Sequence, residues 1–195
     1  GDVPLTTRDT LMRLIDAASH CASGLALDLP VPEIDGIEMH KAFFERLRTQ
    51  CGKEVWLYTC CCPTGAWPNR FLDFHLNKGL LLPWFCDHYG CRGYLHWGGN
   101  QWGQDKDQYA DTGFQGDGFI LLPGPEGPVP TLRWLALRMG IEDFECLQIL
   151  RARGDIDQAD ALRRLLITGP TNYRYDVGSL RDVRRRLYRA LLADG

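Results

Sequence analysis

Helical and extended segments alternate along the 195 residues, and this alternation constrains the fold more than any other feature of the sequence. Four runs have the β-branched, aromatic and aliphatic character of strands, each bounded by glycine or proline or by a helical stretch. These runs cover residues 24–30, 55–60, 93–97 and 119–122. Because strands that alternate with helices are typical of α/β proteins, we expect a parallel sheet covered by helices.

Helical periodicity predicts several further elements between and after these strands. A helix should follow Thr6 or Thr7, whose hydroxyls can cap its first turn. Apolar residues recur at helical spacing over residues 38–50, 76–89, 131–153, 157–166 and 179–192. Gly52 and Gly90 stand where the first two of these stretches end, as glycine commonly does after a helix. No linker composition divides residues 1–195, so we expect one domain.

Four strand–helix units are half of what a (β/α)₈ barrel of the TIM type contains. A complete barrel needs roughly 250 residues, which is more than this chain has. We therefore expect half of such a barrel, with extra helices beyond the last strand, and an open four-stranded α/β sandwich is the alternative. Since the chain opens with Gly1-Asp2 and no initiator methionine, we expect it to be processed or to be a piece of a longer protein. A half barrel exposes sheet edges, which favours self-association.

Charge and hydropathy exclude two classes of partner. The formal net charge is −3, and an arginine-rich stretch near the end, 181–189, is diluted by Asp176, Asp182 and Asp194. Because the arginines would be spread around a helix, this stretch is typical of a solvated helix surface, and we expect no nucleic-acid partner. The longest apolar candidate, residues 79–85, is far shorter than a membrane span and contains Pro83, so we expect no membrane partner.

The eight cysteines do not follow a metal-binding pattern. Zinc sites usually take paired Cys-x-x-Cys motifs, which are absent, and neighbouring residues such as Cys60, Cys61 and Cys62 would alternate direction on a strand. The spacing Cys86-x-His88-x-x-Cys91 is the nearest approach to a ligand set, at the end of a predicted helix. We therefore expect no metal site. The glycine-rich motifs that hold nucleotide phosphates are also absent, so we expect no cofactor.

Polar residues share one face of three predicted strands, near their carboxyl ends. The aliphatic residues of each strand should face the helices. The alternate residues, which include Asp28, Tyr58 and His96, should face the opposite side of the sheet. Active sites of barrels lie at this end of the strands and in the loops that follow. We therefore expect these three side chains to lie near one another.

Aromatic and planar polar residues in the following loops indicate a sugar as ligand. Trp97 and Trp102 can stack on the apolar face of a pyranose, while Arg70 and Asn100 can bond its hydroxyls. The alternative is that the tryptophans only pack beneath their loops. A Cys60 nucleophile with His96 as its base is a second chemical possibility, because the two lie on neighbouring predicted strands.

The order of motifs resembles the C-terminal half of the catalytic domain of glycoside hydrolase family 123, also catalogued as domain of unknown function 4091. The matching stretches include Gly93-Tyr-Leu-His-Trp-Gly-x-Asn-x-Trp102, Gly116-Asp-Gly118 and Gly140-Ile-Glu-Asp143. Others are Asp28-x-x-x-Pro32, Gly52-Lys-Glu-Val-Trp-Leu-Tyr-Thr-Cys60, Pro68-Asn-Arg-Phe-Leu-Asp73, Leu122-Pro-Gly124 and a helix carrying Arg138. Pro30 departs from the family, which often has a tryptophan within its Asp-x-Trp-x-Pro stretch.

This resemblance implies a (β/α)₈ barrel that hydrolyses β-linked N-acetylhexosaminides, with N-acetylgalactosamine as the characterised sugar. It implies substrate assistance, in which the 2-acetamido oxygen attacks the anomeric carbon and an adjacent Asp-Glu pair supplies the acid/base. No such pair stands at a strand end here, because the adjacent acidic residues Glu142 and Asp143 match a late helix. We therefore assign no catalytic residue and expect this chain to supply sugar-binding walls, while a non-catalytic binding module and a purely structural relative are the alternatives.

Overall fold

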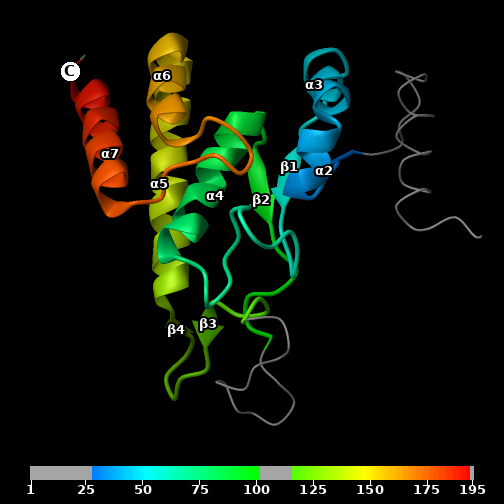
Figure 1. The fold of residues 1–195 in the computed structure, drawn as a ribbon, viewed down its shortest axis with the longest axis vertical. Helices are drawn as coiled ribbons and strands as arrows, with labels where there is room; N and C mark the ends of the chain where they lie inside the picture. The colour runs from blue at the N-terminus through cyan, green and yellow to red at the C-terminus, as the bar shows by residue number, and fades with distance from the viewer. Residues whose placement is uncertain (1–27, 102–115, 194–195) are drawn as a thin grey trace, which may run out of the picture.

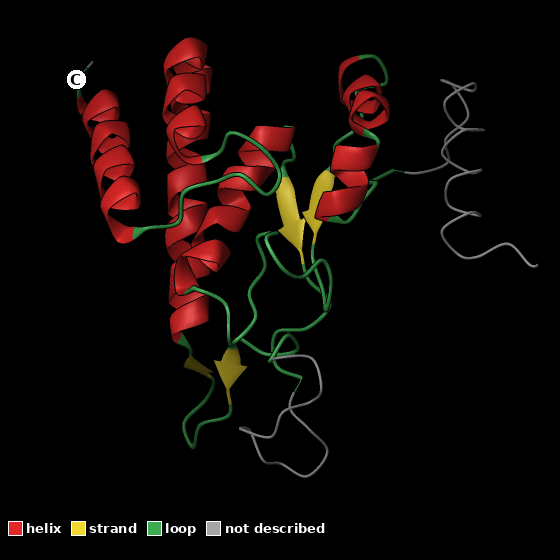
Figure 2. Cartoon of the chain, in the orientation of Figure 1, coloured by secondary structure: helices red, strands yellow, loops and turns green. Residues whose placement is uncertain are grey.

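The computed structural model describes residues 28–101 and 116–193, which form a small parallel sheet, a β-hairpin and several packed helices (Figures 1 and 2). The helices and strands, in chain order, are α2 Ile34–Met39, α3 Lys41–Thr49, β1 Trp56–Tyr58, α4 Leu76–Tyr89, β2 Gly93–Leu95, β3 Leu121–Leu122, β4 Val129–Pro130, α5 Leu132–Arg153, α6 Ile156–Leu166 and α7 Val177–Leu192. The expected helix after Thr6 or Thr7 lies outside the described residues. No helix within the described ranges is long and apolar enough to cross a membrane.

The parallel sheet is built on β1. Its register with β2 places Leu57 opposite Tyr94, and on its other side Glu33 forms a parallel bridge with Tyr58. The backbone N–H of Trp56 donates to the Pro30 carbonyl at 3.1 Å. Of the predicted strand over residues 24–30, residues 24–27 lie outside the described residues, and residues 28–30 are not in a strand, although Pro30 contributes this carbonyl. Proline lacks an N–H but keeps its carbonyl, so it can still pair at the edge of a sheet.

The fourth predicted strand does not join this sheet. Leu121 and Leu122 of β3 pair with Pro130 and Val129 of β4 in an antiparallel hairpin. β3 and β4 pair antiparallel because only a short loop joins them, and β3 forms no ladder with β1 or β2 within the described residues. The mixed α/β class is therefore confirmed, but the described residues do not form four parallel strand–helix units.

Helices α4 and α5 pack side by side and form the centre of the molecule (Figure 1). Almost every residue of α4 is buried, which explains its lack of a polar face. Close packing depends on Gly140 of α5, because a Cβ there would lie 2.0 Å from the Leu80 carbonyl oxygen. The core around these helices includes fully buried Leu81, Trp84 and Leu147.

Most predicted helices are confirmed, with ends shifted by a residue or two. The predicted helix over 38–50 is instead two helices, α2 and α3, which meet at His40. The His40 backbone leaves the helical region with φ −117° while its N–H still bonds to the Gly36 carbonyl. The arginine-rich stretch lies on α7, where Asp182 pairs with Arg185 and Arg186 at the surface.

Candidate functional site

The candidate site lies where β1 and β2 end side by side. Because the two strands run parallel, Tyr58 and the residues after Leu95 emerge at the same edge of the sheet. The Tyr58 and His96 ring centroids are 6.3 Å apart, as the shared parity of these residues predicts. The strand predicted over residues 93–97 ends early, at Leu95, so His96 and Trp97 both lie in the loop after β2.

A buried carboxylate holds the two aromatic residues that follow β2. Asp117 is fully buried, and its Oδ1 lies 2.8 Å from His96 Nε2. Its Oδ2 accepts a hydrogen bond of 2.5 Å from Trp97 Nε1. The indole and imidazole rings are stacked, with centroids 6.1 Å apart. One carboxylate therefore fixes the orientation of both rings.

Arg70 completes what we call the strand-end network, which comprises Arg70, His96, Trp97 and Asp117. Its Nη2 donates to His96 Nδ1 and to the carbonyls of Gly98 and Asp117. Because a guanidinium can only donate, His96 Nδ1 must accept, and the imidazole proton lies on Nε2 facing Asp117. The network therefore selects one neutral tautomer of His96.

A second arginine joins the network to the helical core. Arg133, in the first turn of α5, donates to the carbonyls of Arg70 at 2.9 Å, Gly116 at 2.7 Å and Phe119 at 2.5 Å. These bonds satisfy buried carbonyls in two loops that are distant in sequence. Arg133 therefore positions the loops that carry Arg70 and Asp117.

Burial shifts the pKa values of the groups at this edge. It lowers the pKa of His96, and the Arg70 guanidinium acts in the same direction against the opposing effect of Asp117. Burial, followed by the neighbouring Cys60 and Glu33, raises the pKa of Tyr58 to about 12. Both side chains are therefore neutral at pH 7, and the site presents hydrogen-bonding groups rather than exposed charges.

The structure brings together four of the residues predicted from sequence. Tyr58, Arg70, His96 and Trp97 gather at the strand ends, and Trp97 alone is widely accessible, with 48% of its surface exposed. Arg70 and the His96 side chain are almost completely buried, so in this arrangement they orient their neighbours. The two exposed residues Asp28 and Asn100 lie outside the strand-end network, and Trp102 lies outside the described residues.

Sequence reasoning missed Asp117 as a site residue. Its motif, Gly116-Asp-Gly118, was visible, but the residue follows a long loop and belongs to no predicted strand. Gly118 offers a usable signal, because a Cβ there would come within 3.0 Å of the Trp97 ring. Close packing against Trp97 therefore explains why a glycine stands at position 118, directly after Asp117.

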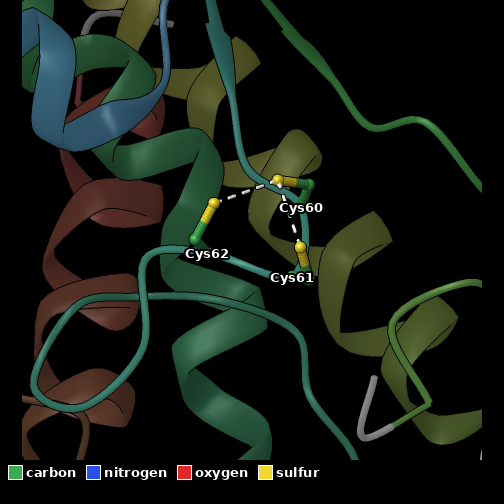
Figure 3. Close-up of side chains that lie close together, drawn as sticks. All are labelled: Cys60, Cys61 and Cys62. Carbon is green, nitrogen blue, oxygen red and sulfur yellow. Dashed lines mark hydrogen bonds between the residues drawn. The ribbon is translucent and has the colours of Figure 1, made fainter. Parts of the chain in front are cut away.

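Three cysteines gather just beyond β1, where we expected their side chains to diverge (Figure 3). That expectation was wrong because residues 60–62 form a turn closed by a bond from Cys60 N–H to the Cys62 carbonyl, 3.0 Å long. The Cys60 and Cys62 sulfurs are 3.3 Å apart, and each contacts Glu33 Oε1. We call Glu33, Cys60, Cys61 and Cys62 the Glu33–cysteine cluster.

This geometry argues against Cys60 as a nucleophile activated by His96. Both His96 nitrogens are already engaged by the strand-end network, and the Cys60 thiol contacts Glu33 Oε1 at 2.9 Å. Burial, followed by the hydrogen bond to Glu33, raises the pKa of Cys60 to about 11. A reactive thiolate requires the opposite shift.

The other cysteine and histidine spacing has an ordinary structural explanation. Cys86 and Cys91 are buried around the end of α4, and the Cys86 thiol donates to the Gly93 carbonyl. His88 Nδ1 accepts a hydrogen bond of 2.6 Å from Arg163. These three side chains therefore stabilise the packing of α4 against its neighbours.

Parallel strands flanked by helices, with a polar network at their carboxyl ends, define an α/β protein whose candidate site lies where enzymes of this class bind substrates. Comparison with known proteins specifies the class further. Residues 6–150 match the family model for the catalytic domain of glycoside hydrolase 123, and the chain belongs to this family. The resemblance inferred from the sequence motifs is thereby confirmed.

The fold is also similar to a solved structure of a family 123 glycoside hydrolase from Clostridium perfringens, whose analysis addresses glycolipid glycan hydrolysis. The TM-score is 0.57 and the sequence identity 17%, so this likeness concerns the fold alone. The similarity covers 82% of this chain and 32% of that enzyme, so the chain spans about a third of its length. No curated protein matches the sequence.

Proposed function

We propose that this chain supplies a sugar-binding wall of a glycoside hydrolase that acts on β-linked N-acetylhexosaminides, with N-acetylgalactosaminides as the preferred class. Membership of glycoside hydrolase family 123 supports a glycosidic substrate. The observation that carries the proposal is the half-exposed Trp97 ring, whose N–H is fixed by buried Asp117. A rigid aromatic face can stack on the C–H surface of a pyranose with little loss of side-chain entropy.

The remaining site residues take different roles in this proposal. Tyr58 lies beside His96 at the same edge and offers a neutral hydroxyl to a sugar. Arg70, His96 and Asp117 hold Trp97 and its loop in place. Asp28, Asn100 and Trp102 are proposed as further sugar contacts, as their motif positions imply.

The acid/base pair is proposed to lie outside these 195 residues, on a barrel half that this chain completes. The adjacent acidic residues of the chain, Glu142 and Asp143, do not serve this role. Asp143 is fully buried and accepts hydrogen bonds from Arg184 Nε at 2.9 Å, the Tyr188 hydroxyl at 2.8 Å and Trp84 Nε1 at 3.2 Å. Glu142 forms an exposed i,i+4 pair with Arg138. Both acidic residues therefore stabilise helix α5 and its contacts.

Binding and turnover by the 195-residue chain test the proposal. We expect methyl β-N-acetylgalactosaminide to bind in isothermal titration, and the corresponding galactoside without its acetamido group to bind more weakly. A chromogenic β-N-acetylgalactosaminide should not be hydrolysed by this chain. Clear turnover would show that the acid/base lies within the chain, whereas absence of binding would favour a purely structural role. Binding without discrimination between the two sugars would favour a general carbohydrate-binding module.

A further inference from the structure

Three potential metal ligands, the sulfurs of Cys60, Cys61 and Cys62, converge in the Glu33–cysteine cluster, and Glu33 lies against two of them. The proposed function does not use this cluster. The sulfurs of Cys60 and Cys61 are 3.9 Å apart, and those of Cys60 and Cys62 are 3.3 Å apart. All three sulfurs lie within 4.8 Å of one another. Glu33 Oε1 lies 2.9 Å from the Cys60 sulfur and 3.1 Å from the Cys62 sulfur. The sulfurs point toward a common centre in Figure 3.

The fold builds this arrangement from two segments that are distant in sequence. The parallel bridge between Glu33 and Tyr58 places the Glu33 side chain next to the residues that follow β1. Fully buried Asn69 then holds the turn, because its carboxamide donates to the carbonyls of Cys60 at 2.9 Å and Pro63 at 3.1 Å. The ligand atoms are therefore positioned by backbone pairing and by a buried side chain.

The spacing of these atoms suits a tetrahedral ion. With Zn–S bonds of about 2.3 Å, the sulfurs of a tetrahedral site are about 3.8 Å apart. The Cys60–Cys61 sulfur distance of 3.9 Å agrees with this value, the Cys60–Cys62 distance of 3.3 Å is shorter, and the sulfurs of Cys61 and Cys62 lie within 4.8 Å. Small side-chain rotations would therefore be needed to place the three sulfurs around one ion. The Glu33 oxygen is somewhat nearer to the sulfurs than a bound ion requires, because thiol hydrogen bonds now hold it there.

We propose that Cys60, Cys61 and Cys62 form a binding site for a thiophilic divalent cation, with Zn²⁺ as the natural class of ligand, and that Glu33, which contacts two of the three sulfurs, turns to supply the fourth ligand. Thiolate sulfur and carboxylate oxygen are both zinc ligands, and sulfur disfavours Mg²⁺ and Ca²⁺. Each thiol releases its proton to solvent as its sulfur binds the ion, and Glu33 changes from hydrogen-bond acceptor to ligand. Exposed Cys61 gives the ion a path from solvent.

A bound ion would link the segment before α2 to the loop after β1. That loop leads through Asn69 to Arg70, so the ion would stabilise the backbone that carries the strand-end network. The backbone N–H of Arg70 already donates to Asn69 Oδ1 at 2.8 Å. The inference is independent of the sugar proposal, because its ligand and its readout are both different.

Metal titration of the reduced, metal-free 195-residue chain tests this inference. With a phosphine reductant present, we expect one equivalent of Zn²⁺ to bind and to raise the melting temperature, whereas Mg²⁺ does neither. Co²⁺ should give the charge-transfer absorption of thiolate ligands. The Cys60→Ser/Cys62→Ser variant should bind Zn²⁺ at least about 100-fold more weakly, and Glu33→Gln about 10-fold more weakly.

Cys146→Ser is the matched control, because this half-buried thiol packs against the helical core instead of joining the cluster. It should bind Zn²⁺ as the unaltered chain does. The proposal is overturned if the folded, reduced chain takes up no Zn²⁺, or if the double variant binds it as tightly as the control. A Cys60–Cys62 disulfide that persists in the reductant, detected as a loss of two hydrogens by mass spectrometry, would overturn it as well.

Discussion

Asp117 is the single carboxylate that orients both rings of the strand-end network. Replacing it in Asp117→Asn leaves one oxygen to accept a hydrogen bond and turns an amide donor toward a second N–H. Because a buried donor is then unsatisfied, we expect the free energy of unfolding to fall by about 2–4 kcal/mol. Urea denaturation measures this loss. Glu142→Gln, which alters an exposed carboxylate, should change stability by less than about 0.5 kcal/mol. Equal effects of the two variants would contradict the assigned role of Asp117.

His88 should make the stability of the chain depend on pH. Burial and the nearby Arg163 guanidinium lower the pKa of His88 to about 4, whereas the unfolded value is about 6.5. As the pH falls, His88 therefore takes up a proton in the unfolded state before it does so in the folded state. The contribution of neutral His88 to the free energy of unfolding is fully present above pH 6.5 and is lost as the pH falls toward 4. Burial lowers the pKa of His96 too, which adds a dependence of the same sign.

Melting temperatures between pH 7.5 and pH 4 measure this dependence. We expect a decline toward low pH in the unaltered chain and a smaller decline in His88→Gln, whose amide oxygen can still accept the bond from Arg163. The difference between the two curves isolates His88 from His96. Parallel curves would show that His88 does not titrate differently in the folded and unfolded states.

Much of the candidate site could be predicted at the residue scale because strand parity is local. The shared parity of Tyr58 and His96 follows from residues close in sequence. Parity alone turns Trp97 toward the helices, and the family motif is what indicates that it belongs to the site. Asp117 could not be placed in this way, because its contacts depend on how a distant loop returns to β2. The turn at Cys60–Cys62 was also missed, since three consecutive cysteines give no signal for where a strand ends.

The crossing of α4 and α5 depends on a glycine, and this dependence can be tested at the scale of the element. In Gly140→Ala the new Cβ would meet the Leu80 carbonyl oxygen at 2.0 Å, so the helices must separate. We expect a loss of about 2–3 kcal/mol of unfolding free energy, although alanine favours helix by about 1 kcal/mol.

Gly36→Ala in α2 is the matched control, because a Cβ there has no atom within 4 Å. It should leave stability unchanged or raise it by up to about 1 kcal/mol. Thermal or urea denaturation of both variants measures the contrast. Stabilisation by Gly140→Ala would contradict the close helix contact.

The long helices could be predicted from the sequence, whereas the short strands of the hairpin could not. The long helices α4 and α5 follow from sustained apolar patterns, and the glycines Gly90 and Gly154 end them in the left-handed region. The hairpin formed by β3 and β4 could not be foreseen, because β4 is only Val129–Pro130 and its pairing is set by the tertiary turn.

For the whole molecule, the exposed edge of β2 has consequences for association. Within residues 28–101 and 116–193, β2 pairs with β1 on one side and no strand covers its other edge. Leu95 at this edge is 43% exposed. Unpaired backbone groups beside apolar surface favour self-association, so we expect the apparent mass to rise with concentration in size-exclusion chromatography with light scattering. A monomeric profile at every concentration would contradict this expectation.

In the proposed site, the fold holds Trp97 as a platform for sugar rather than as part of the core. Trp97→Ala should weaken binding of methyl β-N-acetylgalactosaminide by about 5- to 150-fold, equivalent to about 1–3 kcal/mol, because an aromatic contact is lost. Trp97→Phe keeps the ring and should retain most of the affinity. Trp134→Ala, at an exposed tryptophan of α5, is the matched control and should bind as the unaltered chain does.

Isothermal titration of these variants, with their melting temperatures measured in parallel, distinguishes a sugar platform from a core residue. We predict a large loss of sugar affinity in Trp97→Ala with only a modest loss of stability, because the ring is half exposed. Truncation of a core tryptophan would instead remove about 3–5 kcal/mol of unfolding free energy. A large fall in melting temperature with unchanged sugar affinity in the folded protein would contradict the assignment of Trp97 to the site.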